Sequence, residues 1–476
     1  MRKLEYKWVV GIVFTFGIFM GLLDMTIVNV ALPTFAKEFD APTTTIEWVV
    51  TAYLLSLAVF IPVSGWAGDR FGTKRTFMFA LSVFTVGSLL CSLAWDIEPL
   101  IAFRVLQGVG GGMLTPVGTA MLFRAFPPAE RARAAALLAI PTAVAPATGP
   151  VLGGYLVEYQ SWHWIFLINI PVGLVGLLVA GLFLREEKQA SPGRLDIPGF
   201  VLSAIGLAAV IYALAEAGSS GFDDIRVLAS GIPGLALLAV FCLVELRTAE
   251  PLIDVRLLRD SLFRAANTVQ FAGFAGYAGA LFLLPLLLQA EMGFSPLESG
   301  LITFPQAIGV VMMVQPVNRL YKRVGPRRLV MIGTAGGTVT TLAFLLVDLD
   351  TSRWLIQLIM LARGWSFAFA LVPMQAVAFA TISSELTGRA SAIFNACRQV
   401  AASFGVALLG TVLTNRLTHQ GATLGNPFTR DGALLAFHDA FLAASIVVGL
   451  AVVAALLISD RKAAHTMREP AATAVH

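Results

Sequence analysis

An aspartate lies deep inside the first long apolar stretch of the sequence. Asp24 belongs to an apolar run that extends to about residue 30. An ionised Asp at the centre of a membrane helix costs about 2.5–3.5 kcal/mol on insertion scales, so such residues usually face protein or a watery cavity and mark a proton or substrate pathway. The spacing of Gly17, Gly21 and Asp24 predicts a stripe of small residues that lets another helix cover the carboxyl group. We favour this functional role over a purely structural hydrogen bond.

A cation lies inside a later apolar stretch. One predicted helical face carries a cation, an amide and small residues, namely Arg104, Gln107, Gly108, Gly111 and Thr115. At 1.5 Å per residue, Arg104 lies about 7 Å and Asp24 about 14 Å from the outer ends of their predicted helices, so the two charges could meet. The pair could therefore be switched during a functional cycle. The alternative is an Arg104 side chain that extends to the membrane surface.

The composition defines the class of protein. The chain has 476 residues, of which 57% are hydrophobic and 13% charged, and its mean hydropathy is +0.80. These values predict a polytopic membrane protein and argue against a soluble enzyme. The net charge of +4 comes from basic residues in short loops, so nucleic acid is not an expected partner. Cys91, Cys242 and Cys397 lie in apolar runs without ligand-like spacing, and no metal or cofactor is predicted.

Apolar runs of membrane-spanning length predict fourteen helices. They lie near residues 8–33, 46–66, 76–95, 99–123, 134–157, 163–184, 197–217, 226–246, 263–290, 297–317, 329–347, 354–380, 390–415 and 438–458. Of the 33 Lys and Arg residues, 25 fall in the two tails and the loops on their side, 5 in the opposite loops and 3 within helices. The positive-inside rule then places both termini in the cytoplasm. The segment 416–437 is expected to be a surface loop.

An internal repeat organises these helices. The loop after the second helix and the loop after the tenth share a glycine followed by two basic residues, with Gly72 and Gly325 separated by 253 positions. Since this offset spans eight helices, two six-helix halves with an inserted pair are predicted. The predicted domains are an N-terminal bundle (1–190), the inserted pair (191–262), a C-terminal bundle (263–460) and a cytoplasmic tail (461–476). The fold class is therefore all-α, with fourteen transmembrane helices in a 6+2+6 arrangement.

Several of these stretches together resemble one family. Residues 65–75 (GWAGDRFGTKR) resemble the signature loop of the major facilitator superfamily, and the Asp24 stretch resembles the first-helix motif of its 14-helix drug:proton antiporter family. Residues 104–111, 149–154 and 162–173 resemble the motifs of the fourth, fifth and sixth helices. Two positions depart from the pattern: Ala145 replaces a glycine of the fifth-helix motif, and Lys322 stands where a second signature loop would carry Asp.

The resemblance implies roles for two sets of residues. The cytoplasmic gate loop would comprise Gly65, Asp69, Arg70, Gly72, Lys74 and Arg75, and the antiporter motif of the fifth helix would comprise Pro146, Gly149, Pro150, Gly153 and Gly154. Asp69 opposes the positive-inside trend, and we expect it to meet the amide groups at the start of the thirteenth helix, near residues 388–391. The prolines and glycines of the fifth helix predict either a bend that serves alternating access or a static packing kink.

A second set of polar residues lies within the predicted helices. These candidates for a cavity are Asn29, Gln107, Asn395, Arg398 and Arg363. The second half contributes no intramembrane carboxylate, so its two arginines either bond to backbone carbonyls or line the cavity, and both interpretations stay open. Aromatic residues such as Phe274, Tyr277 and Phe367 are compatible with an apolar lining, but aromatic residues at such spacing more often serve ordinary packing, and no substrate contacts are assigned to them.

These features predict a proton-coupled antiporter that exports small amphipathic compounds across the cytoplasmic membrane by alternating access. One site that binds either a proton or a cargo couples the two by competition. No nucleotide-binding loop is present, so the energy source is expected to be the proton gradient. The expected partners are the lipid bilayer, protons and the amphipathic substrate, and the involvement of a periplasmic adaptor stays open. The alternatives are a related carrier with a narrow natural cargo, such as a lipid, secreted metabolite or siderophore, and a non-transporting scaffold.

Overall fold

The computed structural model describes residues 5–125, 145, 148–186, 195–248, 251–382 and 386–463. Regular structure in these residues is entirely helical. The elements are α1 (Tyr6–Glu38), α2 (Thr43–Phe71), α3 (Thr73–Ser92), α4 (Ile97–Ala125), α6 (Trp164–Leu167), α7 (Asn169–Phe183), α8 (Ile197–Ser220), α9 (Ile225–Arg247), η2 (Val255–Arg259), α10 (Ser261–Pro285), η3 (Leu286–Glu291), α11 (Pro296–Thr303), α12 (Pro305–Val324), α13 (Pro326–Leu342), η4 (Ala343–Leu346), α14 (Arg353–Phe379), α15 (Thr387–His419) and α16 (Arg430–Ala455).

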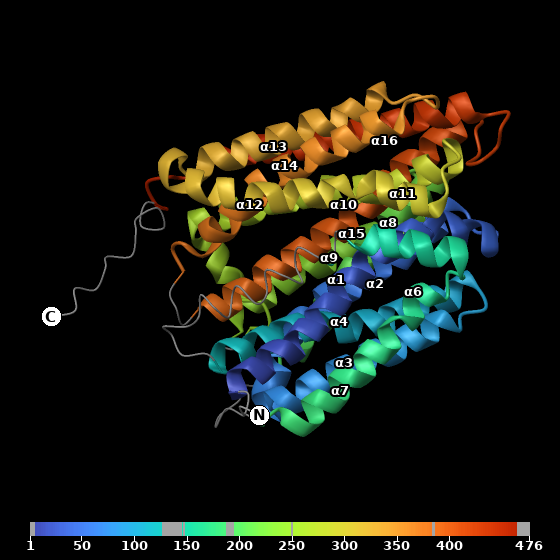
Figure 1. Ribbon diagram of the computed structural model, residues 1–476. Helices are drawn as coiled ribbons and strands as arrows, with labels where there is room; N and C mark the ends of the chain where they lie inside the picture. The colour runs from blue at the N-terminus through green and yellow to red at the C-terminus, as the bar shows by residue number, and fades with distance from the viewer. Residues whose placement is uncertain are drawn as a thin grey trace.

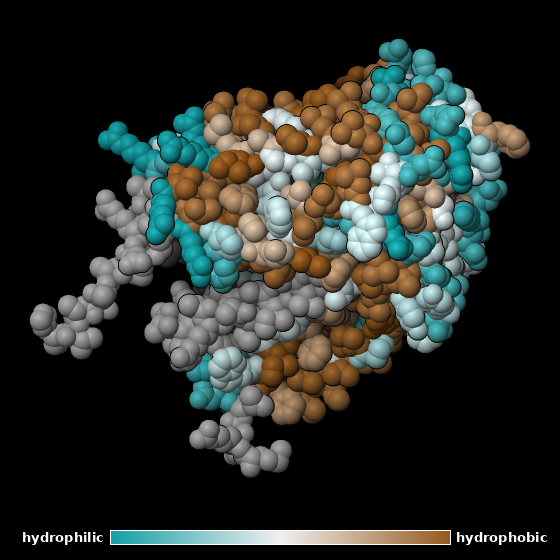
Figure 2. Space-filling model, turned by 45° about the horizontal axis from the view of Figure 1, so that its top comes forward, coloured by the Kyte–Doolittle hydropathy of each residue, from teal (hydrophilic) through white to brown (hydrophobic). Residues whose placement is uncertain are grey.

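The helices are long and apolar enough to cross a membrane. Among the described residues, thirteen helical segments meet this criterion. Residues 148–159 are also helical and belong to the predicted fifth helix, most of which lies outside the described residues. The predicted fourteen-helix architecture is confirmed. Figure 2 shows hydrophobic side chains across the middle of the visible face and hydrophilic ones at both ends, the distribution expected of a protein that spans a bilayer.

The helices form two bundles that run roughly parallel to one another (Figure 1). In the first, α4 packs against α1, α2 and α3; in the second, α14 packs against α10, α12 and α13. The bundles meet along α2 and α15. Helix α8 contacts both of these helices, and α9 packs on α8. The helix pair that the sequence places between the bundles therefore lies beside their interface.

One end of the molecule holds the start of α1 and the end of α16 (Figure 1), and we call it the terminal end. The loops predicted to repeat lie there and share a conformation. Gly72 and Gly325 each precede a helix with a positive φ, 98° and 88°, which glycine adopts without strain. The backbone NH groups of Lys74 and Arg75 at the start of α3 donate to Glu186, and that of Arg327 at the start of α13 donates to Asp460. An anion thus satisfies the same helix terminus in both bundles.

The structure corrects the predicted end of the chain. Helix α15 continues to His419 and α16 begins at Arg430, eight positions before the predicted 438, so the surface loop predicted over 416–437 is confined to about residues 420–429. The predicted helix 297–317 is broken at Phe304, where Pro305 begins α12 because a proline has no NH group for an uninterrupted helix. The domain limits assigned from the sequence stay predictions.

Candidate functional site

Asp24 and Arg104 form a buried ion pair. Asp24 is 0% exposed and Arg104 is 1% exposed. A guanidinium nitrogen of Arg104 (Nη1) donates to Asp24 Oδ2 at 2.5 Å, and Nε donates to the Val49 carbonyl at 3.1 Å. The guanidinium also lies over the Tyr53 ring, 3.9 Å from its centroid. The charge pair expected from helix geometry is therefore present, and Arg104 does not extend to the membrane surface.

Gln107 and Asn169 add hydrogen bonds to this pair, and Ser88 accepts from both of them. Gln107 accepts from Arg104 Nη1 at 2.6 Å and donates to Asp24 Oδ1 at 2.8 Å. Asn169 donates to Asp24 Oδ1 at 3.3 Å and to Ser88 at 3.0 Å. Helices α1, α3, α4 and α7 thus each contribute a residue to one network. Gln107 was expected in the cavity, whereas Ser88 and Asn169 were not predicted.

Glycines bring these helices close together. A Cβ atom added at Gly87 of α3 would lie 2.6 Å from the Gln107 Cα, so only glycine allows α3 and α4 to approach at this level. Gly17 of α1 packs in the same way, since a Cβ atom there would lie 3.2 Å from Phe77. Gly21, in contrast, has no atom of the described residues within 4 Å of such a Cβ position. Among the described residues, the predicted small-residue stripe on α1 is therefore a packing surface at Gly17 but not at Gly21.

The predicted gate loop lies at the terminal end. Gly65, Arg70 and Arg75 are exposed, Asp69 and Lys74 are half-buried, and Gly72 is buried. The Lys74 ammonium donates to the Gly181 carbonyl at 2.8 Å, and Arg75 lies 3.6 Å from the Glu186 carboxylate. These basic residues therefore fix α3 to the end of α7. The expected contact of Asp69 with the start of α15 stays a prediction, as do the gating roles of the loop.

The described part of the antiporter motif lies between the two bundles. Added Cβ atoms at Gly149 and Gly153 would overlap Thr26 and Ile27 of α1, and one at Gly154 would overlap the backbone of residues 296–297 in α11. The Pro150 carbonyl lies against Gly300 of α11 with equally little space. Pro146 lies outside the described residues. This helix therefore packs closely against both bundles at the end opposite the termini.

The remaining cavity candidates do not join the Asp24 network. Asn29 donates to the Met25 carbonyl one turn earlier on α1, and Asn395 donates to the Ser391 carbonyl on α15. Arg398 lies over the Phe274 ring, 5.7 Å from its centroid. Arg363 is 3% exposed and donates to the Tyr277 carbonyl at 3.3 Å. Both arginines thus approach aromatic residues of α10.

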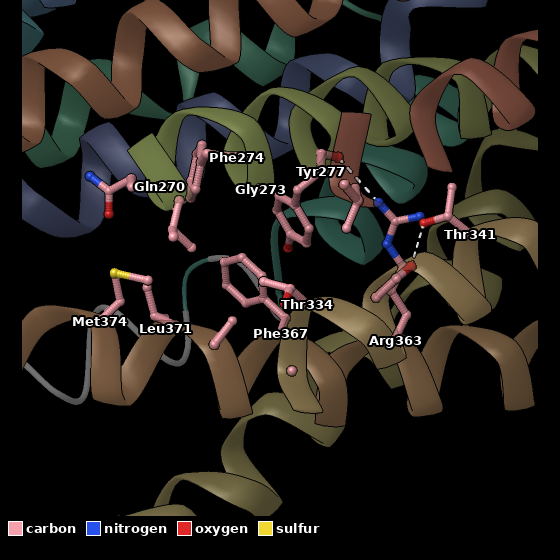
Figure 3. Close-up of a pocket in the computed structure, with 15 residues that line it drawn as sticks. Gln270, Gly273, Phe274, Tyr277, Thr334, Thr341, Arg363, Phe367, Leu371 and Met374 are labelled. Carbon is pink, nitrogen blue, oxygen red and sulfur yellow. Dashed lines mark hydrogen bonds between the residues drawn. The ribbon is translucent and has the colours of Figure 1, made fainter. Parts of the chain in front are cut away.

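Arg363 belongs to a pocket inside the second bundle (Figure 3). The pocket encloses about 610 Å³, including the part open to solvent, and it is formed by α10, α13, α14 and α16. The aromatic residues Phe274, Tyr277 and Phe367, for which the sequence favoured ordinary packing, line its wall. The rings of Tyr277 and Phe367 stack with their centroids 4.2 Å apart.

One buried carboxylate was missed by the sequence analysis. Glu47 of α2 is 0% exposed, and neither of its carboxylate oxygens has a hydrogen-bond partner among the described residues. It faces α15, where an added Cβ atom at Gly410 would overlap the carboxylate. One turn further along α2, the Thr51 carbonyl accepts a hydrogen bond from Ser403 of α15 at 3.2 Å. Glu47 therefore lies in the interface between the bundles.

Two six-helix bundles with a buried charge network and a separate amphipathic pocket define a polytopic membrane transporter. The sequence profile described as Major Facilitator Superfamily matches residues 14–406. The chain belongs to this superfamily and is a transporter rather than an enzyme. Its fourteen helices agree with the resemblance to the 14-helix drug:proton antiporter family.

Curated relatives carry related descriptions. A multidrug resistance protein B homolog of Mycobacterium tuberculosis is 36% identical over 84% of this chain and 75% of its own length. A putative multidrug resistance protein, MdtD, of Salmonella typhi is 36% identical over 86% of both chains. An uncharacterised transporter of the superfamily, YhcA of Bacillus subtilis, is 32% identical over 90% of this chain and 81% of its own.

Solved structures share the fold. The crystal structure of a D-xylose–proton symporter superposes with a TM-score of 0.69 at 15% identity, covering 96% of this chain and 99% of that one. A bacterial homolog of the lysosomal transporter Spinster, in an inward-facing and unoccupied conformation, gives 0.67 at 17% identity, covering 99% of this chain and 100% of that one. At these identities the likeness concerns the fold alone.

Proposed function

We propose that this transporter exports small amphipathic compounds from the cytoplasm in exchange for protons. The observation that carries the proposal is the complete burial of Asp24 beside Arg104, in the middle of a membrane-spanning helix. Burial disfavours the charged carboxylate, whereas the adjacent guanidinium favours it. A conformational change that separates the pair would therefore load a proton on Asp24, and re-formation of the pair would release it.

The protein would lie in the plasma membrane. The distribution of basic residues supports an orientation in which the terminal end faces the cytoplasm. Contacts between the bundles lie near the opposite end: Gln289 donates to the Val30 carbonyl at 2.9 Å, and Glu158 accepts from the Leu297 NH group at 3.0 Å. These contacts support a conformation that is closed toward the outside. Asp24 is then paired, as a proton-releasing state requires.

The descriptions of the relatives support drugs and other toxic organic compounds as cargo. A narrow natural cargo would use the same coupling. A panel of fluorescent amphipathic compounds in inverted vesicles distinguishes the two, because a broad exporter moves several unrelated compounds and a dedicated carrier moves one class.

The decisive test is efflux from proteoliposomes against an imposed pH gradient. Asp24→Asn keeps the size and hydrogen bonding of the side chain but cannot ionise, and we expect it to abolish proton-driven efflux in a folded protein. Asp24→Glu should retain part of the activity. The matched control is Asp350→Asn, since Asp350 is an exposed carboxylate. Near-normal, pH-driven transport by the Asp24→Asn variant would remove Asp24 from the mechanism.

A further inference from the structure

The second bundle contains a counterpart of the Asp24–Arg104 site. Gly72 and Gly325 are separated by 253 positions in the repeat. At the same separation, the position equivalent to Asp24 is Tyr277 and the position equivalent to Ser88 is Thr341. These residues lie on α10 and α13, which occupy the places of α1 and α3 in the repeat. Helix α14, the counterpart of α4, contributes Arg363, which lies six positions after Gln357, the residue at this offset from Arg104. Tyr277, Thr341 and Arg363 all line the one pocket.

The two sites differ in their charges. Arg104 is bonded to a carboxylate, an amide and a backbone carbonyl. Arg363 donates to the Tyr277 carbonyl and lies 5.4 Å from the centroid of its ring, but its buried Nη1 atom has no hydrogen-bond partner among the described residues. The described residues that line the pocket include no carboxylate. Because arginine stays protonated, the pocket holds a buried positive charge without a counter-charge.

The shape of the pocket complements this charge. Figure 3 shows Arg363 and Thr341 at one end, the rings of Tyr277 and Phe367 in the middle, and Leu371 and Met374 at the other end. Ligand pockets typically combine an apolar wall with a few polar groups that fix the orientation of the ligand. An inorganic anion would leave the apolar part of this pocket unfilled.

We propose that the pocket binds an amphipathic organic anion, with an aromatic body packed against the stacked rings of Tyr277 and Phe367 and a carboxylate group against Arg363. This carboxylate takes the place at Arg363 that Asp24 takes at Arg104. The inference names a substrate class for the proposed exporter and rests on that function for transport, but not for binding. A cationic compound is disfavoured because its head group meets Arg363 without a compensating acid.

Three probes with the same aromatic body test the charge preference. They are 1-naphthoate, 1-naphthalenemethanol and 1-naphthylmethylamine, titrated calorimetrically into the purified protein in detergent. We expect naphthoate to bind at least tenfold more tightly than the alcohol, and the amine to bind most weakly, because charge-assisted hydrogen bonds are worth about a factor of ten or more. Arg363→Gln should remove this preference. Arg353→Gln, at the exposed first position of the same helix, should retain it.

A second pair of variants tests the repeat itself and does not depend on removing Arg363. Tyr277→Asp supplies the carboxylate that the first bundle has at this position, so it should pair with Arg363 and lower naphthoate affinity at least tenfold. Tyr277→Asn removes the same ring without adding charge and should lower the affinity much less. Equal effects of the two variants would overturn the proposal.

Equal binding of the three probes by the parent protein would also overturn the proposal. So would competition between chloride and naphthoate at equal affinity, because that result would indicate a site for inorganic anions. These measurements use no gradient, so they stand apart from the Asp24 efflux test. The pocket could prove anion-selective while the Asp24→Asn variant still transports normally. That combination would support the anion-binding proposal and refute the role of Asp24 as the proton carrier.

Discussion

Glu47 gives the sharpest prediction about the interface between the bundles. Its carboxylate is buried against Gly410 of α15 with no hydrogen-bond partner in the described part of the chain, and the buried hydroxyl groups of Thr51 and Thr414 also lack one. An ionised carboxylate in such a place costs several kcal/mol. We therefore expect Glu47 to be protonated whenever α2 and α15 are packed together, and ionised when water enters between them.

No nearby cation compensates this carboxylate. Several charged groups lie on the neighbouring helices near the end of the molecule that holds Glu47. They are Lys37 and Glu38 of α1, Glu98 and Arg104 of α4, Glu216 of α8, Glu291 at the end of η3, and Arg416 and His419 of α15. Arg104 is paired with Asp24, Arg416 with Asp439 and Glu216 with Arg226. Lys37, Glu38, Glu98 and His419 are exposed, and Glu291 accepts from the Gly425 NH group. The described part of the chain therefore supplies no cation that pairs with the Glu47 carboxylate.

The magnitude follows from the ordinary pKa of a glutamate in water, about 4.3. Protonating such a group at pH 7 costs about 4 kcal/mol, a cost that falls by about 1.4 kcal/mol for each unit of decrease in pH. The closed interface should therefore weaken as the pH rises. Glu47→Gln has the shape of the protonated form and should stabilise the closed interface by up to about 4 kcal/mol at pH 7, with no dependence on pH.

Opening can be measured by the rate at which a maleimide reagent labels a cysteine at Thr414 in nanodiscs, after the three native cysteines have been replaced. The parent protein should label faster at pH 8 than at pH 6, by up to tenfold for each unit beyond the rise that any exposed cysteine shows as its thiolate fraction grows. Glu47→Gln should label slowly at both values, while Glu98→Gln, at an exposed carboxylate of α4, should behave like the parent. Gly410→Ala should label quickly throughout, because the added methyl group overlaps the carboxylate. The same pH profile in the parent and in Glu47→Gln would refute this reasoning.

Three further predictions concern topology and stability. Cysteines placed at Asp223 and Gly425 should react with an impermeant reagent from outside the cell, whereas cysteines at Lys74 and Arg327 should not; external labelling at Lys74 would reverse the orientation. Gly87→Ala should cost about 1–3 kcal/mol of stability and displace Gln107 from Asp24. Gly21→Ala, whose methyl group meets no atom of the described residues within 4 Å, should be tolerated in thermal unfolding. Glu186→Gln should destabilise the protein by at most about 1 kcal/mol, since the carboxylate is partly exposed. A larger loss of stability in thermal unfolding would indicate that Glu186 does more than accept hydrogen bonds from the first NH groups of α3.

The sequence predicted the architecture because the relevant signals are large. A membrane helix needs about twenty apolar residues, and few other structures require such runs. Asp24 and Arg104 were predicted as a pair because charges inside these runs are costly and helix geometry placed them about 7 Å apart in depth, within reach of a long guanidinium side chain. The repeat was found because positive-φ glycines such as Gly72 and Gly325 have few substitutes.

Other features left no comparable signal. A single Ser88 or Asn169 in an apolar helix costs little, so nothing in the sequence marked either residue as a partner of Asp24. Glu47 was overlooked because it lies near the predicted start of its helix, where a carboxylate is ordinarily solvated; its burial depends on α15, which is more than 300 positions away in the chain. The early start of α16 was missed because residues 430–437 include polar side chains in the first turns of the helix.

The Asp24 network has the properties that reversible protonation requires. If Asp24 binds a proton, Arg104 loses its counter-charge but keeps the Val49 carbonyl, the Gln107 oxygen and the Tyr53 ring. The neutral carboxyl group can in turn keep the amides of Gln107 and Asn169 as donors. Most hydrogen bonds of the network are therefore kept when Asp24 is protonated, and the change falls mainly on the counter-charge of Arg104. Arg363 has no such set of partners, and this difference is why the two halves of the repeat are expected to bind different things: a proton in the first, and an organic anion in the second.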